Sequence, residues 1–88
     1  MTLSDTFTGT SISFDINGMV NVAIGGDTLN TKIEYQPHGF TDWFPLQVEI
    51  GTDTVVTAKS VFNVTLPRGN IRFNGGTSVT VIVTPETI

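Results

Sequence analysis

The chain has 88 residues, no cysteine, one histidine and a formal net charge of -4. This length fits one domain with a small core, and the absence of thiols excludes disulfides, thiolate zinc sites and cysteine nucleophiles. Charged residues make up only 14% of the chain and form no basic run, so the sequence predicts neither nucleic-acid binding nor a membrane partner.

The N-terminal residues 1–10 are polar and threonine-rich, with isolated apolar side chains at Leu3 and Phe7. We expect this segment to be a flexible arm or a loosely held edge strand, which packing against a partner would order. Residues 11–88 then form a single β-sandwich domain.

Residues 11–24 carry the clearest local pattern. Polar and apolar side chains alternate from Ser11 to Ile16, which is typical of a half-buried strand. Asn17-Gly18 supplies the two positive-φ positions of a type I′ turn. We therefore predict a hairpin in which Met19–Ile24 returns antiparallel to the first strand.

Turn signals divide the rest of the chain into further short strands. Gly25-Gly26-Asp27 ends the second strand, and residues 36–43 form a predicted loop. The run over residues 44–50 contains Pro45, which restricts it to an edge or a bulged strand. Another turn is predicted at Pro67-Arg68-Gly69-Asn70. The remaining predicted strands cover residues 31–35, 55–58, 62–66, 71–73 and 79–83.

About seven or eight short strands, with no helical periodicity, are typical of an all-β domain. We predict an antiparallel β-sandwich, immunoglobulin-like or jelly-roll-like. Its core is expected to contain apolar side chains from the inward face of each strand: Ile12, Phe14, Val22, Ile33, Trp43, Phe62, Val64 and Val81.

The segment Tyr35–Phe44 contains the densest cluster of aromatic and polar side chains and is the best candidate site. In one interpretation, Phe40 and Trp43 stack on a sugar or a partner side chain, and His38 and Asp42 form hydrogen bonds. In the other, Trp43 lies between the sheets, which is the commoner place for the single tryptophan of a small sandwich.

No motif supports catalysis or metal binding. An enzyme would need His38 as a base, a hydroxyl nucleophile and an orienting acid such as Asp42, and no known catalytic pattern places them together. The aspartates are dispersed, without a calcium-loop motif. We expect a non-enzymatic protein with no metal and no cofactor. Arg68 and Arg72 either meet an acidic partner or pair within the domain.

Several segments together resemble small β-sandwich modules of tailed-bacteriophage virions: Ile16-x-Gly18, Lys32-Ile33-Glu34-Tyr35, the loop Pro37 to Trp43, and Leu66 to Phe73 with the valine-rich strand that follows it. The resemblance covers roughly Ser11 to Thr84. The chain departs from the pattern at His38, where those modules have an acid before the glycine, and by an insertion between Ile24 and Ile33.

The resemblance implies a structural virion protein, made in the host cytoplasm and added to the particle. It implies a capsid decoration (cement) protein that binds the major capsid protein or another virion protein, with a homo-oligomer such as a trimer as its form. The alternative is a tail or head-fibre adhesion module that binds carbohydrate or a host receptor through residues 35–44. The expected partner-binding residues are Leu3, Phe7, His38, Phe40, Asp42, Arg68 and Arg72.

Overall fold

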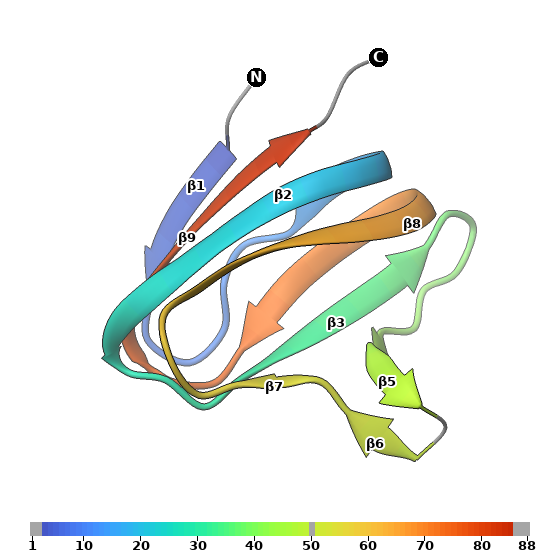
Figure 1. Cartoon of the computed structure of the whole chain (residues 1–88). Coiled ribbons are helices and arrows are strands. Elements are labelled where there is room, and N and C mark those ends of the chain that lie inside the picture. Colours follow the sequence, from blue (N-terminus) through green and yellow to red (C-terminus); the bar gives the residue numbers. More distant parts are fainter. Residues whose placement is uncertain (1–2, 50, 86–88) are drawn as a thin grey trace.

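The computed structural model describes residues 3–49 and 51–85, which form strands and loops (Figure 1). No helix able to span a membrane occurs among these residues. The strands are β1 (Leu3–Phe7), β2 (Phe14–Thr28), β3 (Thr31–Pro37), β4 (Phe44–Pro45), β5 (Gln47–Glu49), β6 (Thr52–Asp53), β7 (Val55–Val56), β8 (Ser60–Asn74) and β9 (Thr77–Pro85). The predicted all-β, antiparallel fold class is confirmed.

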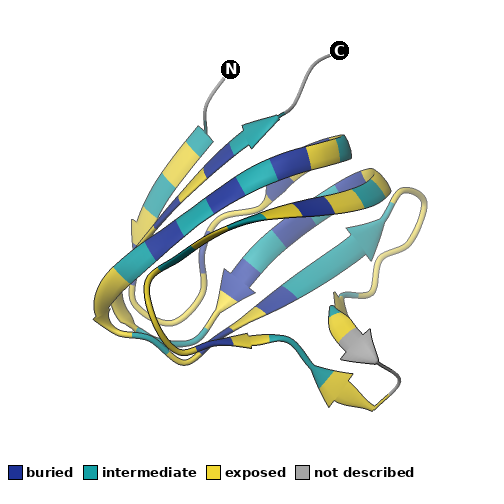
Figure 2. Cartoon of the chain, viewed as in Figure 1, coloured by how far each residue is buried: buried dark blue, intermediate teal, exposed yellow. Residues whose placement is uncertain are grey.

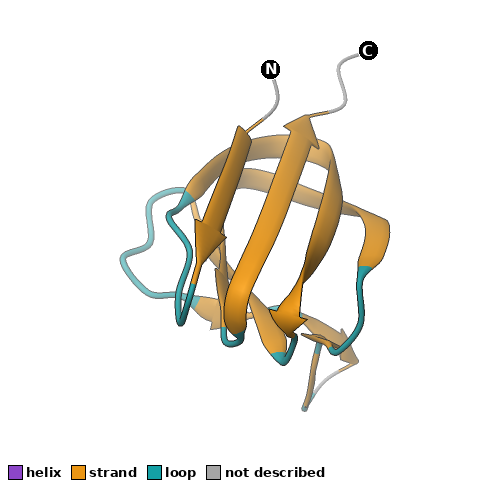
Figure 3. Cartoon of the chain, turned by 90° about the vertical axis from the view of Figure 1, so that its left-hand side faces the viewer, coloured by secondary structure: helices purple, strands orange, loops and turns teal. Residues whose placement is uncertain are grey.

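Two long strands, β2 and β8, link the two layers of the sandwich. The seven-stranded sheet has the order β1-β9-β2-β8-β3-β4, with β7 also paired to β3, and β5 and β6 form a separate pair. The first layer has the order β1, β9, residues 20–28 of β2 and residues 60–66 of β8. Its strands β1 and β9, which end near the N and C labels, lie side by side (Figure 3). In the second layer, residues 69–74 of β8 lie between β3 and the start of β2.

The predicted hairpin at Asn17-Gly18 and the predicted turn at Pro67–Asn70 are wrong, because each lies inside a 15-residue strand. The Asn17-Gly18 and Pro67–Asn70 segments lie opposite each other on the paired strands β2 and β8. Pairing moves from Ile16↔Gly69 to Gly18↔Leu66, so a single β2 residue opposes two residues of β8. This β-bulge tolerates a proline, which has no N–H to donate, and it bends both strands without reversing them.

The bulge also determines which β8 side chains reach the core. Val64 faces inward before the bulge, whereas Ile71 and Phe73 face inward after it, so the inward positions change from even to odd numbers. A one-residue slip turns every following side chain to the other side of a strand. The extra residue therefore lets one strand supply apolar side chains to the core from both layers.

The core lies between the layers. Buried segments alternate with more exposed ones along β2 (Figure 2). The rings of Phe14 and Phe73 meet edge to face, with centroids 5.9 Å apart. The buried apolar residues are Phe7, Phe14, Ile16, Val20, Val22, Ile24, Ile33, Val56, Val64, Ile71, Phe73, Val79, Val81 and Val83.

Five of the predicted core residues are buried, namely Phe14, Val22, Ile33, Val64 and Val81, and Phe62 packs half-buried against them. The prediction for Ile12 is wrong, since its side chain is 58% exposed. Ser11 is buried in its place. The chain does not enter β2 until Phe14, so the alternation before that residue is out of step with the sheet.

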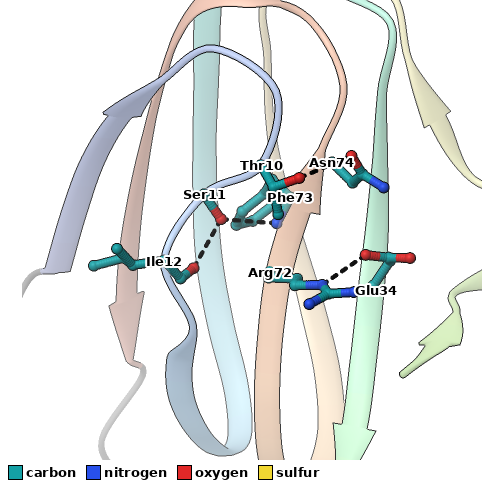
Figure 4. Close-up of polar contacts among 7 residues, drawn as sticks. All are labelled: Thr10, Ser11, Ile12, Glu34, Arg72, Phe73 and Asn74. Atoms are coloured by element: carbon teal, nitrogen blue, oxygen red, sulfur yellow. Dashed lines mark hydrogen bonds and ion pairs between the residues drawn. The ribbon is translucent and has the colours of Figure 1, made fainter. Parts of the chain in front are cut away.

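Buried Ser11 joins the start of β2 to the end of β8. Its hydroxyl oxygen accepts a hydrogen bond from the backbone N–H of Phe73 at 2.9 Å, and the hydroxyl donates to the Ile12 carbonyl at 2.8 Å (Figure 4). The Ser11 N–H also donates to the Phe73 carbonyl at 2.8 Å. A polar side chain is stable in this position because its hydrogen-bonding groups are satisfied.

Replacing Ser11 by alanine is expected to lower the free energy of unfolding by about 1–3 kcal/mol, because the buried N–H of Phe73 loses its acceptor. Thr10→Ala is a matched control: the exposed Thr10 hydroxyl bonds the Asn74 side chain, so its loss should change stability by only a few tenths of a kcal/mol. Urea denaturation measures both variants. Equal destabilisation would contradict the assignment.

Residues 3–7 form an edge strand, which is one of the two states expected for residues 1–10. β1 pairs antiparallel with β9 from Leu3↔Val83 to Phe7↔Val79. A carboxylate oxygen of Asp5 accepts the Ile12 N–H at 3.1 Å. The part of the expected flexible arm that the structure describes is thus hydrogen-bonded into the sandwich, and residues 1–2 lie outside the described part.

Candidate functional site

The aromatic loop, residues Tyr35–Phe44, is fixed to the bend of β8. The Tyr35 hydroxyl donates to the backbone carbonyls of Pro67 and Arg68, at 2.8 and 3.3 Å. The His38 N–H donates to the Arg68 carbonyl at 3.1 Å. The β-bulge leaves these carbonyls free to accept from another segment. The same irregularity that bends the sandwich therefore holds the loop in place.

Two phenylalanines of the aromatic loop are exposed. Phe40 is 57% exposed and Phe44 is 43% exposed. Their rings meet edge to face with centroids 5.8 Å apart. A turn closed by the Phe40 N–H and the Pro37 carbonyl, 3.0 Å apart, positions the first ring. Aromatic surface of this kind contacts sugars or apolar side chains of a partner.

Trp43 lies outside the core, so the expectation that it fills the space between the sheets is wrong. The guanidinium carbon of Arg72 lies 4.3 Å from the centroid of the Trp43 ring. Arg72 Nε is also 2.7 Å from the carboxylate of Glu34, as Figure 4 shows. Glu34 and Arg72 are paired across β3 and β8, on the face opposite the buried Ile33. The tryptophan therefore covers the outside of the second layer through a cation–π contact.

The predicted partner-binding residues fall into two groups. His38, Phe40 and Asp42 are exposed together on the aromatic loop, beside the exposed Arg68. Leu3, Phe7 and Arg72 differ from the prediction. Phe7 is a core residue with 8% exposure and Leu3 packs half-buried against the core, because the expected arm is a strand of the sheet. Arg72 is engaged by Glu34 and Trp43.

A polar cluster attaches the β5–β6 pair to β3. Lys32 Nζ lies 3.1 Å from a carboxylate oxygen of Asp53, and the Gln47 side-chain amide donates to the other at 2.8 Å. The Gln47 hydrogen bond, followed by the Lys32 contact, lowers the pKa of Asp53 below its usual 3.8. Both partners favour the ionised carboxylate.

The pKa of Asp53 is expected to rise in Gln47→Leu and in Lys32→Met, since each substitution removes a contact that favours the ionised carboxylate. Because the folded-state pKa is lowered, these contacts stabilise the fold above pH 3.8 and lose their effect as pH falls through the lowered value. NMR titration of the carboxyl carbon measures both variants. An unchanged pKa of Asp53 in Gln47→Leu would contradict the assigned cause.

The structure also contains a wide uncharged surface that the sequence did not predict. The outer side of the first layer, which we call the neutral face, carries the side chains that alternate with the core positions of four strands. It consists of Ser4, Thr6, Met19, Asn21, Ala23, Gly25, Val61, Asn63, Thr65, Thr80, Ile82 and Thr84. The polar–apolar alternation predicts which residues of each strand point outward. Only the order of the strands in the sheet shows that these residues form one surface.

The neutral face has polar cross-strand contacts and a shallow depression. Thr6 and Thr80 hydroxyls are 3.0 Å apart, and the Asn21 amide donates to Asn63 at 3.1 Å. The depression, about 430 Å³ and open to solvent, is lined by Ala23, Ile24, Gly25, Lys59, Ser60, Val61, Thr80 and Ile82. None of the residues of the neutral face is charged, and Lys59 lies at the border of the depression.

The side chains of the aromatic loop and of the neutral face can make van der Waals contacts and hydrogen bonds. Among residues 3–49 and 51–85, no three histidine, aspartate or glutamate side chains gather as a metal site would need. Comparison of the chain with protein-family models, curated proteins and solved structures finds no match.

Proposed function

We propose that the protein is a structural component of a phage virion, a capsid decoration protein that binds the outer surface of the head and stabilises it by protein–protein contacts. The sequence resemblance suggests the virion, and the neutral face supports a role in contact. A surface four strands wide without a charge at its centre loses little solvation energy when another protein covers it.

The distribution of charge on the two layers supports the same role. The ion pairs Lys32–Asp53 and Glu34–Arg72 both involve β3, in the second layer. The first layer is free of charge at its centre, so a negatively charged chain can approach an acidic protein on that side with little repulsion.

Co-sedimentation with particles of the major capsid protein encoded in the same genome tests this function. We expect the wild-type chain to sediment with the particles. Ile82→Glu places a charge at the centre of the neutral face and should abolish binding, whereas Phe40→Ala should leave it intact. A folded wild-type chain that stays in the supernatant would contradict the proposal.

A second candidate function is adhesion to a carbohydrate or host receptor through the aromatic loop. The exposed Phe40–Phe44 pair and the Trp43 ring held on Arg72 favour it, because rigid aromatic surfaces bind sugars by stacking. Titration with host surface polysaccharide should change the fluorescence of Trp43, the single tryptophan, and Phe40→Ala should remove the response. An unchanged emission spectrum argues against adhesion.

A further inference from the structure

The outer edge of the first half of β8 is open. Residues Ser60–Leu66 pair with β2 on one side, and β3 begins to pair with β8 only at Gly69. Within the described residues, no backbone hydrogen bond reaches the other side of Ser60–Leu66. This edge therefore presents N–H and C=O groups to a further strand.

The open edge lacks the features that normally prevent strand addition. Ser60–Leu66 contains no charged residue, no proline and no bulge. Edge strands usually carry at least one of these features. At the other edge of the first layer, β1 has the acidic residue Asp5, whose carboxylate binds the Ile12 N–H. The two edges differ, and only the β8 edge is uncharged along its length.

The core is incompletely covered along the same edge. Phe62 and Leu66 belong to the inward face of β8 and pack against the core but are only partly buried, whereas Val20 and Val22 of the neighbouring β2 are fully buried. An added strand would cover the part of these two side chains that is still accessible to solvent. Burial of such apolar surface favours association.

We propose that two copies of this chain pair antiparallel through Ser60–Leu66, with Asn63 on the two-fold axis. In this register Phe62 faces Val64 of the second copy on the inward side, and Val61 faces Thr65 on the outward side. The sequence is thus complementary to itself, apolar against apolar and uncharged against uncharged. The first layers and their neutral faces become continuous across the two copies.

Pairing of identical edges gives a two-fold dimer, because each copy uses the same patch. The trimer implied by the sequence resemblance would need a different contact. This dimer goes beyond the proposed virion function and does not depend on it: a monomer that sediments with capsids would overturn the dimer alone, and a dimer that does not sediment would overturn the virion role alone.

Sedimentation equilibrium over a concentration series tests the pairing. The wild-type chain should approach twice its mass of 9.5 kDa as concentration rises. Val61→Lys/Thr65→Lys places like charges opposite each other at two symmetric contacts and should weaken the dimer about tenfold or more. Val61→Lys/Thr65→Glu should retain it, because opposite charges then meet across the axis.

Ile82→Lys is the matched control, since it adds a charge to the same face on β9, two strands from the edge. It should leave the dimer unchanged, and circular dichroism should show all variants folded. Three results would each overturn the proposed pairing. The first is a monomeric wild-type chain, and the second is loss of the dimer in Ile82→Lys. The third is an equal effect of Thr65→Lys and Thr65→Glu when each is combined with Val61→Lys.

Discussion

Gly69→Ala is expected to lower the free energy of unfolding by about 2–3 kcal/mol, although it adds a single methyl group. Gly69 lies at the β8 bulge, where β3 comes very close. A Cβ at this position would overlap the Gln36 carbonyl oxygen and approach the Tyr35 ring to 2.9 Å. Neither neighbour can move easily, since Tyr35 is hydrogen-bonded to Pro67 and Gln36 lies in the β3–β8 ladder.

Gly25→Ala is the matched control for this prediction. Gly25 lies in β2 on the neutral face, and the atom nearest to an added Cβ is the Cβ of Lys59, 3.8 Å away. The control should be neutral or stabilising by a few tenths of a kcal/mol, because alanine reduces the freedom of the unfolded chain. Urea denaturation of both variants gives the comparison. A Gly69→Ala protein as stable as Gly25→Ala would show that the bend can relax.

Phe73→Ala is expected to cost about 3–5 kcal/mol. The ring of Phe73 is fully buried and packs edge to face on Phe14 in the core. At roughly 0.05–0.15 kcal/mol per residue, a chain of 88 residues has few kcal/mol to spare. The variant should therefore be largely unfolded at moderate urea concentrations, or in water if the wild type is near the lower limit.

Phe40→Ala removes a ring of the same kind from the aromatic loop, where it is 57% exposed, and should change stability by less than about 0.5 kcal/mol. Thermal and urea unfolding followed by circular dichroism distinguish the two. Similar losses for Phe73→Ala and Phe40→Ala would mean that the core is not where the structure places it.

The sequence predicted which faces of the strands are buried but not how the strands connect. Alternation correctly identified Phe14, Val22 and Val81 as inward, because a period of two depends only on the local chain. The turn signals at Asn17-Gly18 and Pro67–Asn70 led to wrong predictions, since each sequence can either reverse the chain direction or bend a continuous strand. The bend is set by pairing between residues such as Gly18 and Leu66, 48 or more positions apart, and this pairing has no local signature.

The candidate site was predicted in part. The aromatic loop was located from its composition, and Phe40 is exposed as a binding residue requires. The position of Trp43 depends on Arg72, which reaches it from β8 in the second layer, so spacing along the chain could not reveal it. The open β8 edge was also beyond prediction, because an edge exists only once the strand order is known.

The place of β9 in the sheet affects how the chain can fold during synthesis. β9 lies between β1 and β2, and Leu3 pairs with Val83. Nearly all of the described sequence must therefore leave the ribosome before β1 can pair with β9. Contacts so distant in sequence form slowly. We expect the nascent chain to remain without a stable sandwich until β9 emerges, and chains truncated before Thr77 to be substrates for chaperones and proteases.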